Sequence, residues 1–234
     1  DLQGTARADI TRIDEYKKAI ELDPKNFTAH FSLGQAYQTM GLHEDAVEEF
    51  RAALKVESVY PAAYFGIGNS YSEMGRYQDA IDAYRNAVNL DPLYGDAQLG
   101  LGWALLQQKQ CKKAIKPMQQ AIHLLPGSPP AHFNLAQCYS ILRQYPDAIG
   151  EFRKAIQLNS IYPEAHLGLG MSYEALNQFD KAIGEYKKSL NLVPNSESSL
   201  TKLSHAYLLT HRYEDALAPL KNVLYNNPKN EEAI

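Results

Sequence analysis

Histidines are the first side chains in this 234-residue chain that could do chemistry, because imidazole binds zinc and transfers protons near neutral pH. His30, His132 and His166 are the strongest candidates. No two histidines lie four residues apart with a carboxylate between them, as a helical zinc site requires. The interval from His132 to His166 is instead the same as that from His30 to Tyr64. We therefore interpret these histidines as packing residues and predict no metal site.

Cysteine is the next reactive residue type, and the chain has two, Cys111 and Cys138. Their spacing matches neither a CxxC motif nor a zinc-ligand pattern, so both are predicted to be small buried residues. Two such thiols weakly favour a reducing compartment, and we expect a cytoplasmic protein.

Three Gly-x-Gly segments could suggest a nucleotide site: residues 66–68, 100–102 and 168–170. Each lacks the third glycine of a dinucleotide-binding loop. No Ser/His/Asp set can be singled out either. We therefore predict no catalytic residues and no cofactor, and we do not expect an enzyme.

Composition excludes other classes. The chain has 27 acidic and 23 basic residues, a net charge of −4, and 45% hydrophobic residues. It lacks the basic excess that binds a phosphate backbone, so nucleic acid is not an expected partner. No window reaches about 18 consecutive apolar residues, so direct membrane insertion is not expected.

An internal repeat must position any functional residues. Alanine recurs at a constant interval, at Ala46, Ala80, Ala114, Ala148, Ala182 and Ala216, whose numbers rise by 34 each time. A column of small residues has the same period: Gly34, Gly68, Gly102, Ala136, Gly170 and Ser204. So does a column of large apolar residues: Phe50, Tyr84, Met118, Phe152, Tyr186 and Leu220. Such a period is typical of stacked repeats, in which small residues allow helices to cross closely and large ones fill the space between repeats.

Each repeat is predicted to contain two helices. In residues 61–94, apolar residues recur at intervals of three and four, which indicates two amphipathic helices. Gly75 lies between them, where a left-handed cap would end the first helix. The equivalent residues are Gly41, Lys109, Arg143, Asn177 and His211. Prolines such as Pro92 end most repeats, because proline cannot donate a helix hydrogen bond.

These columns of Leu-Gly, Tyr, Ala, aromatic, Ala and Pro resemble the tetratricopeptide repeat family. The resemblance implies an all-α fold, a right-handed superhelix of antiparallel helix pairs whose first helices line a concave groove. We count six full repeats, at 27–60, 61–94, 95–128, 129–162, 163–196 and 197–230. Residues 9–26 resemble the second helix of an earlier repeat and 231–234 the start of a later one, so 1–234 would form a single array.

The resemblance also implies that ligands contact positions 2, 5, 9, 12 and 13 of each repeat. The groove residues predicted on this basis are large apolar side chains and amides: Phe31, Gln35, Phe65, Asn69, Leu99, Trp103, Phe133, Asn134, Gln137, Leu167 and Met171. Positions 2, 12 and 13 carry no Lys or Arg but include Glu73 and Glu174, which predicts an acidic edge. Glycines such as Gly66 are predicted to open the groove wall to a partner.

The resulting hypothesis is a non-catalytic scaffold that binds a protein or peptide with apolar anchors and neutral or basic flanks. In an alternative, the residues at position 5 only pack against the neighbouring repeat. Two other functions also stay open. The array ends could stack into a homo-oligomer, or the chain could be the regulatory or substrate-recruiting arm of a larger enzyme.

Overall fold

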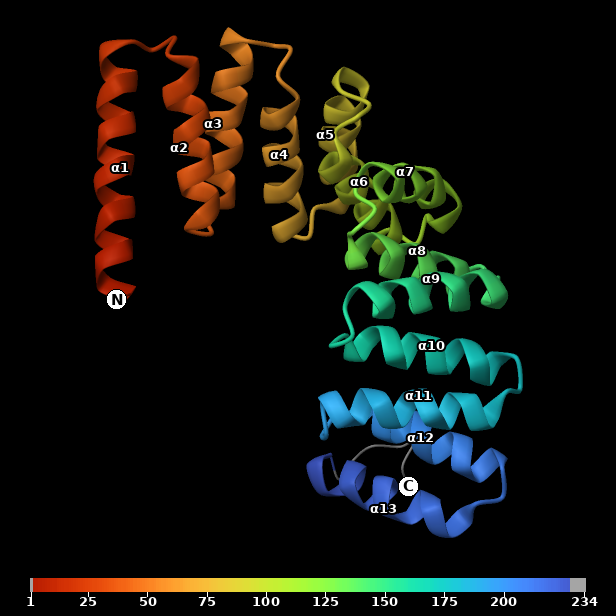
Figure 1. Ribbon diagram of the computed structural model, residues 1–234. Helices are drawn as coiled ribbons and strands as arrows, with labels where there is room; N and C mark the ends of the chain where they lie inside the picture. Colours follow the sequence, from red (N-terminus) through yellow and green to blue (C-terminus); the bar gives the residue numbers. More distant parts are fainter. Residues whose placement is uncertain (1, 228–234) are drawn as a thin grey trace. The chain divides into compact units, whose positions relative to one another are not determined.

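The computed structural model describes residues 2–227, and every regular element in that range is an α-helix (Figure 1). The chain divides into two compact units, Asp1–Leu125 and Pro126–Ile234, which we call unit 1 and unit 2. The segment 231–234, predicted to start a further repeat, lies outside the described residues.

Unit 1 contains seven helices among the described residues: α1 (Leu2–Leu22), α2 (Phe27–Thr39), α3 (His43–Val56), α4 (Pro61–Glu73), α5 (Tyr77–Leu90), α6 (Gly95–Gln107) and α7 (Cys111–Leu124). Helix α1 begins at Leu2, ahead of residue 9, where the partial repeat was expected to begin. Each helix packs against the next one in sequence (Figure 1). The pairs α2/α3, α4/α5 and α6/α7 correspond to the predicted first and second helices of a repeat.

Unit 2 repeats the same pattern with six helices in its described part: α8 (Pro129–Ile141), α9 (Tyr145–Leu158), α10 (Pro163–Ala175), α11 (Phe179–Leu192), α12 (Glu197–Leu209) and α13 (Tyr213–Asn226). Its core is a cluster of buried residues from consecutive helices, with Phe152, Tyr186 and Ala182 among them. The residues of this cluster come largely from the repeating columns, so the periodic sequence builds a continuous core by stacking.

Helix boundaries follow from local chemistry. Pro61 and Pro163 begin α4 and α10, where a missing N–H costs nothing. Asn26 caps α2 by accepting a hydrogen bond from the backbone N–H of Ala29 at 3.0 Å. The turn after each first helix contains a residue of positive φ: Gly41, Gly75, Lys109, Arg143, Asn177 and His211. The prediction of left-handed caps is therefore confirmed, even where the residue is not glycine.

Candidate functional site

The first helices form an inner face in each unit. In unit 1, α2 contacts α4 and α4 contacts α6; in unit 2, α8 contacts α10 and α10 contacts α12. The second helices make no such contacts with one another within either described unit. In each unit, the first helices therefore lie closer to one another than the second helices do. All eleven predicted groove residues lie on these first helices.

Aromatic residues at position 5 are half-buried on this face rather than fully exposed. The ring of Phe31 lies 5.1 Å from that of Tyr60 and 5.6 Å from that of Phe50. Phe65 packs in the same way on Tyr84 and Tyr94. In unit 2, Phe133 contacts Phe152 and Tyr162. Leu99 and Leu167 are also half-buried. Part of each ring packs against neighbouring side chains of its unit, and part stays accessible. These rings can therefore both stabilise the stack and contact a ligand.

Trp103 on α6 lies against the second helix of the preceding repeat. Its ring is 5.6 Å from that of Tyr77 and nearly perpendicular to it. The indole is half-buried, so one part is packed and another reaches solvent. Because Trp103 is the single Trp of the chain, its fluorescence emission can report ligand binding at the inner face of unit 1.

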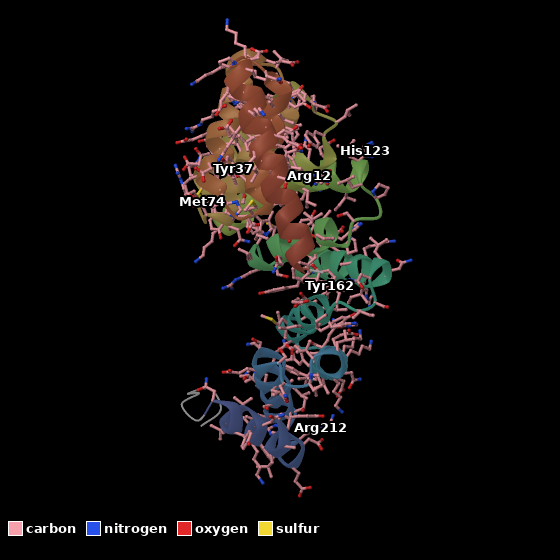
Figure 2. All side chains as sticks on the ribbon, turned by 90° about the vertical axis from the view of Figure 1, so that its left-hand side faces the viewer. Arg12, Tyr37, Met74, His123, Tyr162 and Arg212 are labelled. Carbon is pink, nitrogen blue, oxygen red and sulfur yellow. The ribbon has the colours of Figure 1, made fainter. Side chains whose placement is uncertain are left out.

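The remaining predicted groove residues differ in exposure. Gln35 and Met171 are exposed, Gln137 is half-buried, and Asn134 is only 7% exposed. Gln35 lines a cleft of about 290 Å³ with Arg12 and Tyr16 of α1. Figure 2 labels Arg12 on this helix. Asn134 therefore offers a ligand far less of its amide than Gln35 does.

Asn69 joins a neutral polar cluster in unit 1. The hydroxyl of Tyr84 donates a hydrogen bond to Asn69 Oδ1 at 2.7 Å and lies 3.1 Å from Ser72 Oγ. Burial raises the pKa of Tyr84 to about 12, with a smaller opposing effect from Ser72. The side-chain oxygen of Asn69, one of the predicted groove residues, thus already accepts one intramolecular hydrogen bond.

A charged cluster occupies the matching place in unit 2. The hydroxyl of Tyr186 donates to Glu174 Oε2 at 2.7 Å, and Nδ1 of His205 lies 3.0 Å from Glu174 Oε1. Burial and the contact with Glu174 raise the pKa of Tyr186. His205 also lines a cleft of about 330 Å³ with Lys202. Sequence reasoning placed Glu174 on the groove edge but missed this cluster, because Tyr186 belongs to a second helix.

The predicted role of the groove-wall glycines is wrong. A Cβ added to Gly66 would lie 2.6 Å from Cζ of Phe50, and one added to Gly100 would lie 2.7 Å from the Tyr84 ring. The aromatic side chain of the preceding repeat occupies this space. These glycines therefore admit a ring from inside the protein rather than the backbone of a partner.

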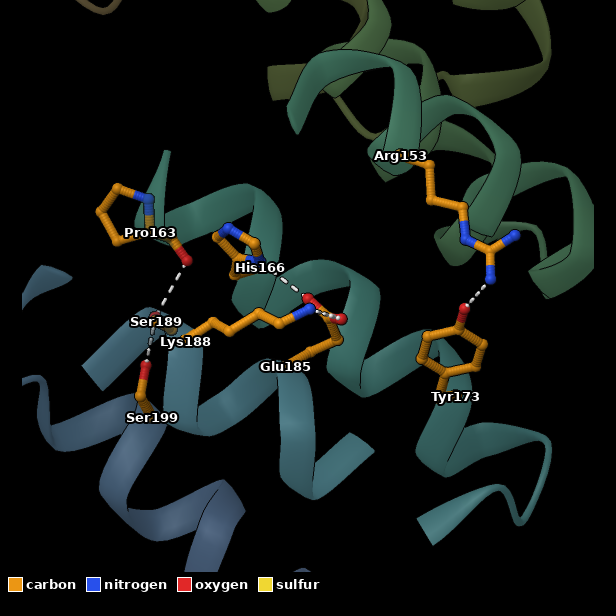
Figure 3. A network of polar contacts seen from close by, with 8 residues as sticks. All are labelled: Arg153, Pro163, His166, Tyr173, Glu185, Lys188, Ser189 and Ser199. Atoms are coloured by element: carbon orange, nitrogen blue, oxygen red, sulfur yellow. Dashed lines mark hydrogen bonds and ion pairs between the residues drawn. The ribbon is translucent and has the colours of Figure 1, made fainter. Parts of the chain in front are cut away.

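The three aligned histidines each pair with a glutamate of the following helix. Nδ1 of His30 lies 2.6 Å from Glu49 Oε2, and the His132–Glu151 and His166–Glu185 pairs have the same geometry. In unit 2, Glu185 also binds Lys188 at 2.8 Å (Figure 3). No group of three or more metal-ligating side chains gathers in the described part of the chain. A separation of 19 residues between His and Glu recurs in all three pairs, and this regularity was a signal in the sequence that could have found them.

Both cysteines are buried and neither forms a disulfide, with Cys111 on α7 and Cys138 on α8. Among the residues that the structure describes, none of the helices combines the length and the apolar character needed to cross a bilayer.

Family models match most of the chain. Models described as "Tetratricopeptide repeat" match residues 31–73, 65–129, 129–160 and 163–196, and a model described as "TPR repeat" matches 13–41. No curated protein sequence matches the chain.

Several solved structures are similar. MamA protein is 25% identical with a TM-score of 0.66, covering 72% of this chain and 92% of its own. YrrB, titled "a TPR protein with an unusual peptide-binding site", is 23% identical with a TM-score of 0.71, covering 79% of this chain and 95% of its own. PilF of Pseudomonas aeruginosa is 19% identical with a TM-score of 0.75, covering 88% and 94%. The likeness to the last two shows the fold alone.

Proposed function

Because the chain belongs to the tetratricopeptide repeat family, we propose that it is a non-catalytic scaffold that binds a peptide segment on the inner face of its helix stacks. The observation that supports this most is the line of half-buried aromatic residues on the first helices of unit 1, Phe31, Phe65 and Trp103. Rings that are packed on one side and accessible on the other are pre-organised to accept apolar anchors at low entropic cost.

The polar residues of this face suggest the flanks of the ligand. Positions 5 and 9 of the three full repeats in unit 1 carry no charge, and exposed acidic residues such as Glu73 and Asp96 lie on the same helices. In unit 2, Glu174 and Glu164 lie on α10. An apolar peptide with neutral or basic flanks matches this distribution better than one with acidic flanks.

The emission of Trp103 tests the proposal. Two peptides with the same apolar anchors, one with basic and one with acidic flanks, are titrated into the protein. We expect a saturable shift in emission with the basic-flanked peptide and a weaker one with the acidic-flanked peptide. Equal responses, or no response to either, would remove the proposal.

A pair of matched variants locates the binding face. Gln35→Lys places a positive charge on exposed inner-face residue 35, and Gln120→Lys places the same charge on α7, a second helix of the same unit. We expect the first to weaken binding of the basic-flanked peptide several-fold and the second to leave it unchanged. The reverse ranking would place the peptide outside the inner face.

A second candidate function, self-assembly, is favoured by the exposed side of α13. Leu217 is 54% exposed, whereas its equivalents Ile81 and Ile183 are 0% and 4% exposed. Tyr213 and Tyr225 on the same helix are 58% and 86% exposed. An apolar helix face of this kind is suited to pairing with a second copy.

Mass measured by light scattering at increasing protein concentration tests self-assembly. We expect growth in mass that Leu217→Lys abolishes and that Leu93→Lys, on an exposed loop residue, leaves intact. A constant monomer mass at all concentrations would leave peptide binding as the single proposal.

A further inference from the structure

A cleft on the opposite side of unit 1 from the inner face has no role in the proposed function. It has a volume of about 490 Å³ and lies between the second helices α3 and α5, with α4 as its floor. Arg51 and Lys55 of α3 form one wall, and Asp79 and Asp82 of α5 form the other. The floor includes Tyr64. A cleft of this size is in the range of ligand sites.

The repeat that holds the cleft lacks a side-chain contact that three other repeats have. In three other repeats, a histidine on the first helix pairs with a glutamate on the second, as His166 does with Glu185 at 2.7 Å (Figure 3). In the second repeat these positions hold Tyr64 and Ala83. Ala83 is too short to reach across, and its methyl group lines the cleft instead.

The two walls carry opposite charge. Arg51 and Lys55 are one helical turn apart on α3, so they lie about 6 Å apart along the wall. Asp79 and Asp82 follow each other similarly along α5. A ligand that carries its negative charges on one side and its positive charges on the other would be complementary to both walls at once.

The present partners of these charges leave them accessible. Arg51 donates to the hydroxyl of Tyr71 at 2.6 Å, a neutral acceptor that does not compensate its charge. Asp82 pairs with Arg85 at 3.3 Å and Asp79 with Arg76 at 2.7 Å, both as exposed contacts within one helix or at its start. Exposed ion pairs of this kind contribute little to stability, so a charged ligand can take the place of Arg76 or Arg85 or bind the aspartates alongside them.

An extended chain fits this arrangement better than a helix. Successive side chains of a strand point to opposite sides, and every second residue is about 6.6 Å further along, close to one helical turn of the wall. A helix with its side chains is about 10–12 Å wide and cannot present alternate residues to both walls. The hydroxyl of Tyr64 and the amide of Asn86 on the cleft lining can bond the ligand backbone.

We infer that this cleft binds an extended segment of a partner protein in which acidic and basic residues alternate, with the acids toward α3 and the bases toward α5. The chain itself contains no run of four residues in which acidic and basic residues alternate, which favours a partner over a second copy. This site is separate from the inner face and does not depend on the peptide proposed to bind there.

The test uses fluorescence anisotropy at low ionic strength with a labelled peptide of alternating Glu and Lys. The control is a peptide of the same composition in which all Glu residues precede all Lys residues. At any point along the cleft, this control would present the same charge to both walls, so one wall would always face a charge of its own sign. We expect saturable binding of the alternating peptide, at least tenfold tighter than binding of the control. Equal affinities, or no binding of the alternating peptide, would overturn the inference.

Two variants place the peptide in the cleft. Tyr64→His combined with Ala83→Glu rebuilds the pair found in three other repeats and should reduce affinity at least tenfold. Asp82→Lys reverses one exposed charge of the α5 wall and should weaken binding without changing the melting temperature. Asp180→Lys makes the same change on the exposed first turn of α11 in unit 2 and should have no effect. Unchanged affinity in the Asp82→Lys variant would overturn the inference even if the double variant failed to fold.

Discussion

The two units can be compared at positions three repeats apart, where the same backbone carries different side chains. In unit 1, Tyr64 and Ala83 leave a cleft between α3 and α5. In unit 2, the equivalent residues are His166 and Glu185, which bind each other, while Glu185 also binds Lys188 (Figure 3). On the same framework, unit 2 thus has a histidine–glutamate contact where unit 1 has a tyrosine and an alanine.

The inner faces differ at a second pair of matched positions, Ser72 in unit 1 and Glu174 in unit 2. The hydroxyl of Tyr84 lies 3.1 Å from Ser72 Oγ and donates to Asn69, whereas the hydroxyl of Tyr186 donates to the carboxylate of Glu174. Both phenol rings lie in the same column and both are buried. The repeat therefore sets where the hydroxyl lies, and the first helix decides whether its partner is neutral or charged.

Other contacts are common to the two units. Arg51 donates to the Tyr71 hydroxyl in unit 1, and Arg153 donates to that of Tyr173 in unit 2. Gly66 and Gly168 both admit the ring of the preceding aromatic residue. These shared contacts join neighbouring repeats, and the differing ones give each unit its own chemistry.

The largest expected effect tests the shared framework. Gly66→Leu and Gly168→Leu each force a side chain into a buried ring, which should cost about 3 kcal/mol of unfolding free energy. Gly184→Ala, where an added Cβ meets no atom within 4 Å, should instead stabilise by about 0.5–1 kcal/mol. Urea unfolding followed by circular dichroism measures both. An unchanged free energy of unfolding in Gly66→Leu or Gly168→Leu would show that the ring moves aside in that unit.

The tyrosine hydroxyls test the difference between the inner faces. Tyr186→Phe removes a hydrogen bond to a carboxylate and should cost about 1.5–3 kcal/mol, whereas Tyr84→Phe removes neutral partners and should cost about 0.5–1.5 kcal/mol. The free energy of unfolding of each variant decides. Equal losses would mean that the charge of Glu174 adds nothing to its bond with Tyr186.

Alkaline pH should reveal the same contrast. The folded-state pKa of Tyr84 is about 12, above its ordinary value of 10.0, and that of Tyr186 is raised as well. The unfolded chain therefore loses these protons at a lower pH than the folded chain does. The contribution of the two tyrosines to the free energy of unfolding is fully present below about pH 10 and falls as the pH rises toward 12. Urea midpoints across this window should fall less steeply in Tyr186→Phe than in the wild type. Parallel curves would contradict the raised pKa of Tyr186.

The smallest expected effect concerns the shared arginines. Arg51→Met and Arg153→Met each remove a guanidinium next to a tyrosine ring and should cost about 0.5–1 kcal/mol. Double-mutant cycles with Tyr71→Phe and Tyr173→Phe measure the coupling. Different coupling energies at the two sites would show that the units diverge here as well.

Much of the fold could be predicted from periodicity. The alanine, glycine and aromatic columns predicted the helix pairs, and the position of Gly75 predicted left-handed caps even at Lys109 and His211. Fixed spacing is informative because each repeat must bury the same face against its neighbours.

The polar contacts of the candidate site could not be predicted as easily. The pairing of His30 with Glu49 joins two helices of one repeat, and its only sequence signal is a recurring separation of 19 residues. The cluster around Glu174 joins residues from three helices, of which Tyr186 belongs to a core column. Columns read one at a time do not reveal such contacts.

The sequence by itself determined the all-α class, the repeat period, the pairing of helices and the places of the caps, because each depends on local propensity and on which residues repeat. Only the tertiary structure decided what lies beside each glycine, which partner each tyrosine hydroxyl bonds and where the walls of the outer cleft carry opposite charge. These features depend on side chains that meet across neighbouring helices, where a difference of one or two residues between otherwise equal repeats changes the chemistry.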